Sequence, residues 1–259
     1  MIAEAAIAGG TIRFYAPSTL LRYRAESVLS KEPDTIEWID KFEEDAVFWD
    51  IGANVGVYSL YAGVRRGVRV LSFEPSAANF HVLSRNIQLN RLCDRVTAYS
   101  IALSAQTQLG VLNMASASMG ASLSQFGRRG ESSRYWDDQT EPVVQGMVGF
   151  SIDDFIARFN PWFPNYLKMD VDGLELPILE GARDTLRDPR LKSLIVELNL
   201  TTAGEHRQAV SLLEDAGFRL ISRGEIQGTQ VEKAANHLFE RSNGVRSATR
   251  KESASKQPW

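Results

Sequence analysis

The sequence of 259 residues predicts an α/β fold with a mostly parallel sheet and helices on both faces. Two observations support this prediction. Short apolar runs alternate with segments whose apolar residues recur at helical spacing. The run AVFWDIG, at residues 46–52, is apolar almost throughout, as expected for a central strand of a parallel sheet that is buried on both faces. A chain of this length can form one such domain with a sizeable core.

The elements can be read in order along the chain. Seven segments after residue 45 have the apolar pattern of strands. They are residues 46–52, 69–75, 95–104, 166–173, 192–199, 218–222 and 236–241. The helices expected between them are residues 55–66, a helix that Ser76 can cap, and residues 152–159, 174–186 and 205–216. In residues 174–186, the apolar side chains of Leu174, Ile178, Ala182 and Leu186 share one stripe.

Three regions of the chain differ in composition. Residues 1–45 form an N-terminal lead-in, with a helix expected at 33–42, which we expect to pack on the core. Residues 46–241 form the main domain. Within it, residues 107–148 have an irregular pattern with hairpin-like pieces. Residues 242–259 are polar and almost free of aliphatic side chains, so we expect a disordered tail.

Composition excludes several classes of function. The net charge of −3 gives no electrostatic reason to expect nucleic acid as a partner. The single cysteine, Cys93, cannot form an intrachain disulfide, which suits a reducing cytoplasm. No run approaches 18 apolar residues, and the N-terminus lacks the features of a signal peptide, so we expect a cytoplasmic protein without a membrane span.

The turn DIGANVG, at residues 50–56, follows the first main-domain strand, where open α/β sheets bind their ligands. A dinucleotide fingerprint needs three glycines, but Asn54 and Val57 stand in place of the second and third. The sequence also lacks a phosphate loop and the metal motifs HExxH and paired cysteines. The turn therefore has the glycine of a close backbone approach without the features of a pyrophosphate site.

Glu74 ends the second main-domain strand, about 20 residues after the turn, where an acid can accept hydrogen bonds from a ribose diol. A nucleoside ligand without a pyrophosphate fits S-adenosylmethionine. Because its sulfonium is cationic, the nearby carboxylates of Asp50 and Asp170 are electrostatically compatible with it.

Several motifs, taken in order, resemble the FkbM family of S-adenosylmethionine-dependent methyltransferases over residues 32–239. They are FWDIGANVGVYSLYA, VLSFEPSAANFHVLSRNIQLN, ALS, SIDDF, YLKMDVDGLELPILEGA and LIVELN. The resemblance implies a class I Rossmann-like fold, usually of seven strands with the last antiparallel. It also implies O-methyl transfer to a hydroxyl of a sugar, glycan or polyketide-type product. In one departure, Asp172 stands where the family usually has glutamate in its D-V-E-G motif.

The resemblance and the strand ends together give three sets of candidate site residues. Those expected at the cofactor are Asp50, Gly52, Asn54, Gly56, Glu74, Ile101, Ala102 and Asp170. Those expected to act in catalysis are Asp170, Lys168 and His206. Those expected at the substrate are Asp172, Glu197 and Asn199. Lys168 and Asp170 point to the same side of their strand, because strand side chains alternate.

Other interpretations stay open at this point. For Asn54, Asp170 and Asp172, the alternative to a role in the site is a structural one, as helix-capping or helix-start residues. A divalent metal at Asp170, Asp172 and Glu197 is conceivable from the carboxylate count, although we expect no metal. A cofactor-binding subunit without catalysis is the alternative function, and a nicotinamide oxidoreductase is disfavoured by the turn.

The acceptor side has less signal in the sequence. Trp162 and Phe163 fit an acceptor pocket and core packing equally well. Acceptor specificity is expected from residues 113–136 and 201–206, in which we recognise no sequence code. A small molecule or a glycan is the expected substrate, whereas the sequence does not identify the acceptor or the oligomeric state.

Overall fold

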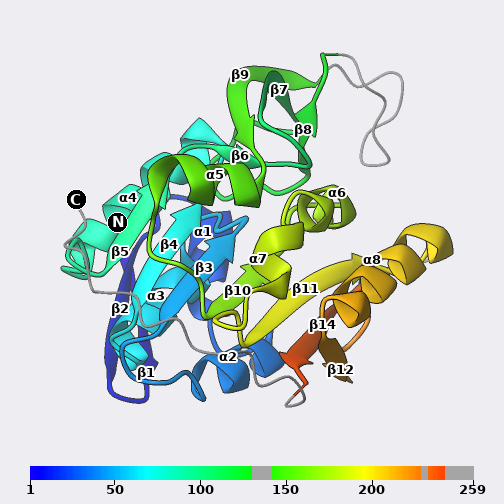
Figure 1. Cartoon of the computed structure of the whole chain (residues 1–259). Helices are drawn as coiled ribbons and strands as arrows, with labels where there is room; N and C mark the ends of the chain where they lie inside the picture. The colour runs from blue at the N-terminus through cyan, green and yellow to red at the C-terminus, as the bar shows by residue number, and fades with distance from the viewer. Residues whose placement is uncertain (130–141, 229–232, 243–259) are drawn as a thin grey trace.

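The central sheet has the architecture that the sequence predicts. The computed structural model describes residues 1–129, 142–228 and 233–242. Figure 1 shows the main sheet, whose strand order is β12-β14-β11-β10-β3-β4-β5. The bounds are β3 Val47–Ile51, β4 Arg69–Phe73, β5 Val96–Tyr99, β10 Tyr166–Met169, β11 Ser193–Asn199, β12 Phe218–Arg223 and β14 Lys233–Arg241. Neighbours from β5 to β11 are parallel, whereas β14 is antiparallel to both β11 and β12. The short strand β13, Gln227–Gly228, also pairs with β14. The predicted mostly parallel sheet with an antiparallel last strand is confirmed.

Helices cover both faces of this sheet, because successive residues of its strands point to opposite sides. In β3, Phe48 packs into a core shared with the lead-in, whereas Val47 and Trp49 pack into a second core on the other face. The helices on the Phe48 side are α1 Thr19–Glu26, α2 Pro33–Ile39, α3 Val57–Arg65 and α4 Ala77–Leu89. Those on the other side are α5 Ile152–Phe159, α6 Glu175–Glu180, α7 Arg183–Arg187 and α8 Ala203–Asp215.

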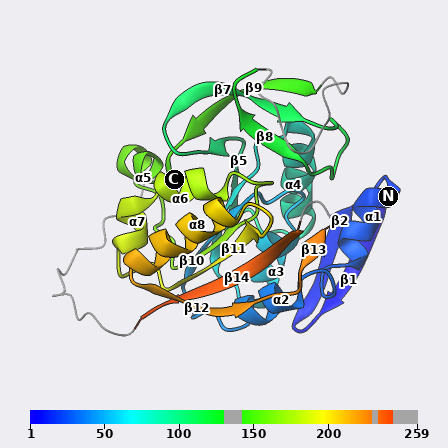
Figure 2. The same cartoon turned by 90° about the vertical axis from the view of Figure 1, so that its right-hand side faces the viewer.

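A small second sheet lies beyond one end of the central sheet (Figures 1 and 2). Its order is β6-β9-β7-β8, with bounds β6 Ala102–Leu103, β7 Gln108–Met114, β8 Ser124–Gly127 and β9 Val143–Phe150. The antiparallel pairs β7–β8 and β7–β9 are the hairpin-like pieces expected in residues 107–148. The single strand expected at 95–104 is instead divided between β5 and β6, because β6 leaves the central sheet to pair with β9.

Two other expectations need correction. The helix expected at 174–186 is broken into α6 and α7. At the break the chain passes close to another backbone: a Cβ on Gly181 would lie 2.5 Å from the carbonyl oxygen of Ser104. The lead-in contains more structure than expected, with an antiparallel hairpin of β1 Ile2–Ile7 and β2 Gly10–Tyr15 followed by α1.

The remaining expectations concern a membrane span, the tail and the specificity segment. In the ranges that the structure describes, no helix is long and apolar enough to cross a membrane. The expected disordered tail, apart from its first residue, and the 130–136 part of the expected specificity segment lie outside the described residues.

Candidate active site

A cleft of about 290 Å³ lies at the carboxyl ends of β3, β4, β10 and β11, under the small sheet. The central sheet contributes polar walls, while β6, β7 and β8 contribute the apolar side chains of Leu103, Leu112 and Phe126. Helix α1 and the segment after it close a further side with Leu20, Tyr23, Arg24 and Lys31. Of the candidate site residues, those that line this cleft are Gly52, Asn54, Glu74, Ile101, Ala102, Asp170, Asp172 and Glu197.

The two glycines of the turn are required by close packing. Gly52 has a φ of +82°, and a Cβ there would lie 1.8 Å from the carbonyl oxygen of Asp170. This turn is therefore glycine because the ends of β3 and β10 meet at it. Gly56 has a φ of +87°, and a Cβ there would lie 2.5 Å from Leu83 Cδ1 on α4. Gly56 thus allows α3 to start against α4, and it is not among the described residues that line the cleft.

Asn54 connects three parts of the site. Its backbone N–H donates to Glu74 Oε2 at 2.8 Å, and its Nδ2 donates to the carbonyl of Ala121 at 2.9 Å. Its buried Oδ1 has no hydrogen-bond partner among the residues that the structure describes. The alternative role of Asn54 as a helix cap is not seen, because Gly56 occupies the N-cap position of α3. Asn54 instead presents an unsatisfied acceptor at the cleft.

Glu74 is held by neutral donors. Its carboxylate accepts hydrogen bonds from the backbone N–H groups of Asn54 and Ser76, both at 2.8 Å. Only 5% of the residue is exposed. Burial raises the pKa of Glu74 to about 7, and the two N–H groups oppose this rise only in part. Glu74 thus lies at the end of β4 and faces the cleft, with a pKa near neutral pH.

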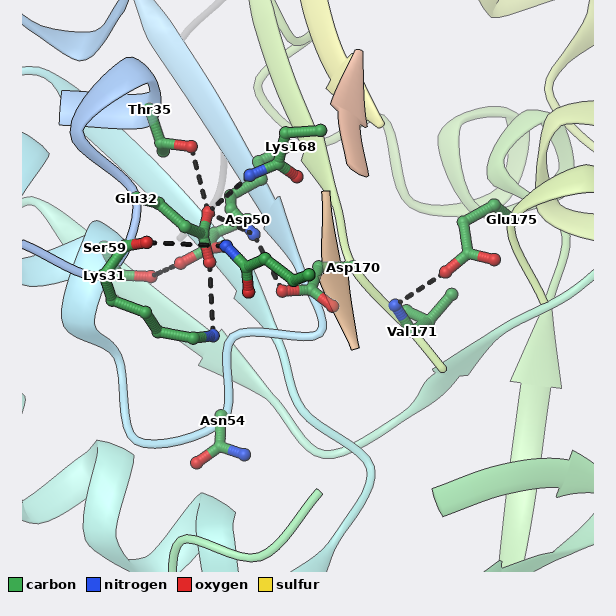
Figure 3. Close-up of polar contacts among 12 residues, drawn as sticks. Lys31, Glu32, Thr35, Asp50, Asn54, Ser59, Lys168, Asp170, Val171 and Glu175 are labelled. Atoms are coloured by element: carbon green, nitrogen blue, oxygen red, sulfur yellow. Dashed lines mark hydrogen bonds and ion pairs between the residues drawn. The ribbon is translucent and has the colours of Figure 1, made fainter. Parts of the chain in front are cut away.

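Asp170 is held by a buried cation (Figure 3). Lys168 Nζ lies 3.1 Å from Asp170 Oδ2, 3.6 Å from Glu32 Oε2 and 4.8 Å from the centre of the Tyr58 ring. Burial lowers the pKa of Lys168, but the surrounding carboxylates outweigh burial and the net shift is strongly upward. For Asp170, burial is the largest effect and raises the pKa, but the charge and hydrogen bond of Lys168, together with the charges of Lys31 and Arg24, outweigh it and the net pKa is lowered. Asp170 is therefore ionised at neutral pH.

Asp50 does not reach the cleft, contrary to expectation. It is 1% exposed and accepts a hydrogen bond from Ser59 Oγ of α3 at 2.5 Å. Burial is the largest of the effects that raise its pKa. The reason is its position within β3, one residue before the strand ends, where the side chain points under α3.

Glu197 lines the cleft beside Asp170, at the end of β11. The charge of Asp170 is the main cause, and burial the second, that raises the pKa of Glu197 to about 9. The two carboxyls at neighbouring strand ends therefore differ at neutral pH: Asp170 is ionised and Glu197 holds a proton.

Asn199 and His206 lie apart from the main cleft. They line a second cavity of about 320 Å³, together with Gln125 and Glu175. His206 Nε2 is 3.2 Å from Nε2 of His237, and burial is the largest effect that lowers the pKa of His206. The structure thus separates these two candidates from Asp170 and Lys168.

Asp172 ties the small sheet to the end of β10. Its Oδ2 accepts hydrogen bonds from the backbone N–H groups of Leu123 at 2.6 Å and Ser124 at 3.1 Å.

Within the described parts of the chain, no group of three or more His, Cys, Asp or Glu is arranged to hold a metal ion, so the metal considered at Asp170, Asp172 and Glu197 lacks support.

Trp162 and Phe163 are partly buried at the edge of the core. Both pack against the core that contains Trp49, and the Trp162 carbonyl accepts a hydrogen bond from Trp49 Nε1 at 2.9 Å. Arginine side chains cover their rings, with Arg69 over Trp162 and Arg190 over Phe163. Of the two interpretations left open, core packing fits these contacts.

Two residues of the site were missed from the sequence. Asn79 lines the cleft, and its Oδ1 accepts from the backbone N–H of Gly120 at 2.7 Å. Its place in the first turn of the helix that follows Glu74 was the available signal. Glu32 contacts Lys168 from the lead-in, and no local pattern marks a residue that precedes Pro33 as part of a distant site.

Comparison with known proteins gives consistent matches. Residues 50–220 match the methyltransferase FkbM domain. The chain is 27% identical to Methyltransferase 1 of Beauveria bassiana, over 68% of this chain and 74% of that protein. It is 26% identical to the 31-O-demethyl-FK506 methyltransferase FkbM of Streptomyces tacrolimicus, over 74% of this chain and 80% of that protein.

A third relative is the hexuronic acid methyltransferase AglP of Haloferax volcanii, 26% identical over 77% of this chain and 74% of that protein. The family match covers more than half of the chain and includes the turn, Glu74 and Asp170. The chain belongs to the FkbM family, and it is an enzyme that takes a methyl group from S-adenosylmethionine.

Proposed function

We propose that this enzyme transfers the methyl group to a hydroxyl of a sugar, a glycan or a polyketide-type natural product. The observation that carries the proposal is the ionised carboxylate of Asp170, which faces a cleft also lined by Glu74. The names of two relatives support the acceptor class, since one is a hexuronic acid methyltransferase and another a 31-O-demethyl-FK506 methyltransferase.

The cleft fits the cofactor in charge and in hydrogen bonding. S-adenosylmethionine carries a sulfonium and an ammonium, and the carboxylates of the cleft suit both cations. The unsatisfied Oδ1 of Asn54 offers an acceptor to the ammonium. Glu74 is placed to accept hydrogen bonds from the ribose hydroxyls, while the backbone at Ile101 and Ala102 would contact the adenine. Gly52 holds the β3 and β10 ends together around this ligand.

The proposed chemistry asks little of the protein beyond positioning and proton removal. S-adenosylmethionine supplies an electrophilic methyl carbon, which the acceptor oxygen takes as the carbon–sulfur bond breaks and S-adenosylhomocysteine forms. Asp170 accepts the proton of the acceptor hydroxyl, because it is the ionised member of its pair with Glu197. A positioned base of this kind typically contributes about 10²- to 10⁴-fold in rate. The ion pair with the buried ammonium of Lys168 orients the carboxylate of Asp170.

A transfer assay tests the proposal. The enzyme is incubated with S-adenosylmethionine labelled in its methyl group and with small-molecule and glycan extracts from a strain that lacks the gene. We expect the label in a product that survives mild base, as a methyl ether does, whereas a methyl ester is hydrolysed. The Asp170→Asn variant serves as control, with turnover lowered at least about tenfold at saturating cofactor. Transfer to a carboxylate, a nitrogen or a carbon would contradict the proposal.

A further inference from the structure

We propose that Glu32, in the lead-in outside the matched family domain, is a positioning residue of the cofactor site. Through Lys168, it sets how much negative charge Asp170 presents to the sulfonium of S-adenosylmethionine. This inference rests on the proposed placement of the cofactor beside Asp170.

Glu32 is a fixed, buried charge. It is 3% exposed, and its Oε2 accepts hydrogen bonds from Thr35 Oγ1 and Asn236 Nδ2, both at 2.9 Å. Its Oε1 lies 3.3 Å from Lys31 Nζ (Figure 3). Burial raises the pKa of Glu32, but Lys168 and Lys31 together reverse the effect and the net pKa is lowered. The carboxylate is therefore ionised and held in one place by donors from α2 and β14.

Lys168 connects Glu32 to the cleft. Its ammonium lies within ion-pair distance of both carboxylates, 3.1 Å from Asp170 and 3.6 Å from Glu32. The Asp170 side chain is 23% exposed, whereas those of Lys168 and Glu32 are each 2% exposed. Asp170 is thus the member of the trio that contacts a ligand. Glu32 acts on the ligand through Lys168, through its ion pair with the cleft-lining Lys31, and through its own field.

The sum of charges gives the direction of the effect. With both carboxylates ionised, the buried ammonium of Lys168 lies between two negative charges, so the trio of Glu32, Lys168 and Asp170 has a net charge of −1, and the more exposed Lys31 adds a cation beside Glu32. Without the Glu32 charge, the ammonium belongs to Asp170 alone and the trio becomes neutral. A buried charge acts on the cleft with little screening, so the loss should weaken attraction for a cation there.

The cofactor and its product separate this effect from general damage. S-adenosylmethionine carries the sulfonium charge, whereas S-adenosylhomocysteine has a neutral thioether and the same adenosine and amino-acid parts. Loss of a negative charge beneath the sulfur should weaken the first ligand more than the second. Loss of shape should weaken both alike.

The experiment measures calorimetric affinities of the full-length chain for both ligands, with melting curves for each variant. For Glu32→Gln, we expect the affinity for S-adenosylmethionine to fall at least about threefold more than that for S-adenosylhomocysteine. Glu32→Asp keeps the charge and should restore most of the ratio. Glu43→Gln is the matched control, because it removes an exposed acid of the same lead-in that pairs with Lys192, and the ratio should not change.

Asp170→Asn distinguishes failure of the proposal from failure of the cofactor placement. If Asp170→Asn shifts the ratio and Glu32→Gln does not, the role of Glu32 is wrong. If neither variant shifts it, the placement beside Asp170 is wrong, and the role of Glu32 falls with it. Should Glu32→Gln not fold, Thr35→Val loosens the same carboxylate, and a shift of the ratio in the same direction but smaller is expected. An unchanged ratio in folded Thr35→Val would then overturn the proposal.

Discussion

The carboxylates at the ends of β4 and β10 face one cleft but are held in opposite ways. Glu74 receives two backbone N–H groups, which are neutral, and its pKa is raised to about 7 because burial dominates. Asp170 is bound to the buried ammonium of Lys168, and its pKa is lowered in spite of burial. The charge of the partner, more than the degree of burial, decides which carboxylate is ionised at neutral pH.

This difference suggests separate tasks for the two ends. Asp170, always charged near neutrality, suits the cationic sulfonium and the departing proton of an acceptor. Glu74, whose charge depends on pH and on its ligand, suits recognition of hydroxyls by hydrogen bonding. The comparison can be tested at each end.

The largest effect is expected when the ion pairs of Lys168 at the end of β10 are removed. Lys168→Met removes the buried ammonium between Glu32 and Asp170, and we expect a loss of about 3–5 kcal/mol in the free energy of unfolding. Denaturant unfolding measures it. Lys192→Met is the control, because this half-exposed lysine pairs with exposed Glu43, and at most about 1 kcal/mol should be lost. Equal losses in the two variants would mean that the buried ammonium is not what stabilises this end.

A smaller effect, on cofactor affinity, is expected at the end of β4, where Glu74 has no charged partner. Glu74→Ala should weaken S-adenosylmethionine binding by roughly 1–3 kcal/mol, the usual cost of leaving hydrogen-bonding groups without partners, and the fold should survive. Calorimetry measures the affinity. Glu175→Ala is a sharp control, since burial also raises the pKa of Glu175 to about 7, but this residue lines the second cavity. If both variants bind the cofactor as the wild type does, Glu74 is not its ribose ligand.

The smallest effect concerns pH. Glu74, Glu175 and Glu197 all have raised pKa values in the folded state, to about 7, 7 and 9. The folded chain then binds more protons than the unfolded chain, so stability falls as pH rises from about 4.5 to 9. The lowered pKa of Asp170 acts oppositely, and its contribution is lost only in acid.

Glu197→Gln isolates the alkaline part of this dependence. Because only Glu197 of the three titrates near pH 9, the variant should flatten the decline in melting temperature between pH 7 and 9 by up to about one proton of linkage. The slope between pH 5 and 7 should flatten as well, but a decline remains there in the variant because Glu74 and Glu175 still hold extra protons in the folded state. A wild-type slope above pH 7 in the variant would show that another group is responsible.

The sequence predicted those features that have a local cause. Buried parallel strands such as β3 are continuous apolar runs, and the position of Glu74 at the cleft could be predicted because it directly follows such a strand. Asp50 was misplaced because a strand pattern does not show where the strand ends, and one residue decides whether a side chain reaches the cleft. The break at Gly181 depends on the approach of Ser104, which no helical pattern contains.

The rest depends on contacts between distant segments. Glu32 reaches Lys168 only because α2 packs against the central sheet, and Asn236 fixes it from the last strand. Asn199 and His206 follow a strand end as the cleft residues do, yet they line another cavity, together with Glu175 and Pro177 of α6. Neither the contact of Glu32 with Lys168 nor the cavity that Asn199 and His206 line can be predicted from the local sequence.

The most direct measurement is a crystal structure of the enzyme with S-adenosylhomocysteine bound. We expect the ribose hydroxyls to donate hydrogen bonds to Glu74, the ammonium to reach Asn54 Oδ1, and the sulfur to face Asp170. Glu74 should keep its bonds from the N–H groups of Asn54 and Ser76. A ribose bound away from Glu74, or a sulfur facing away from Asp170, would contradict the assignment of the two ends.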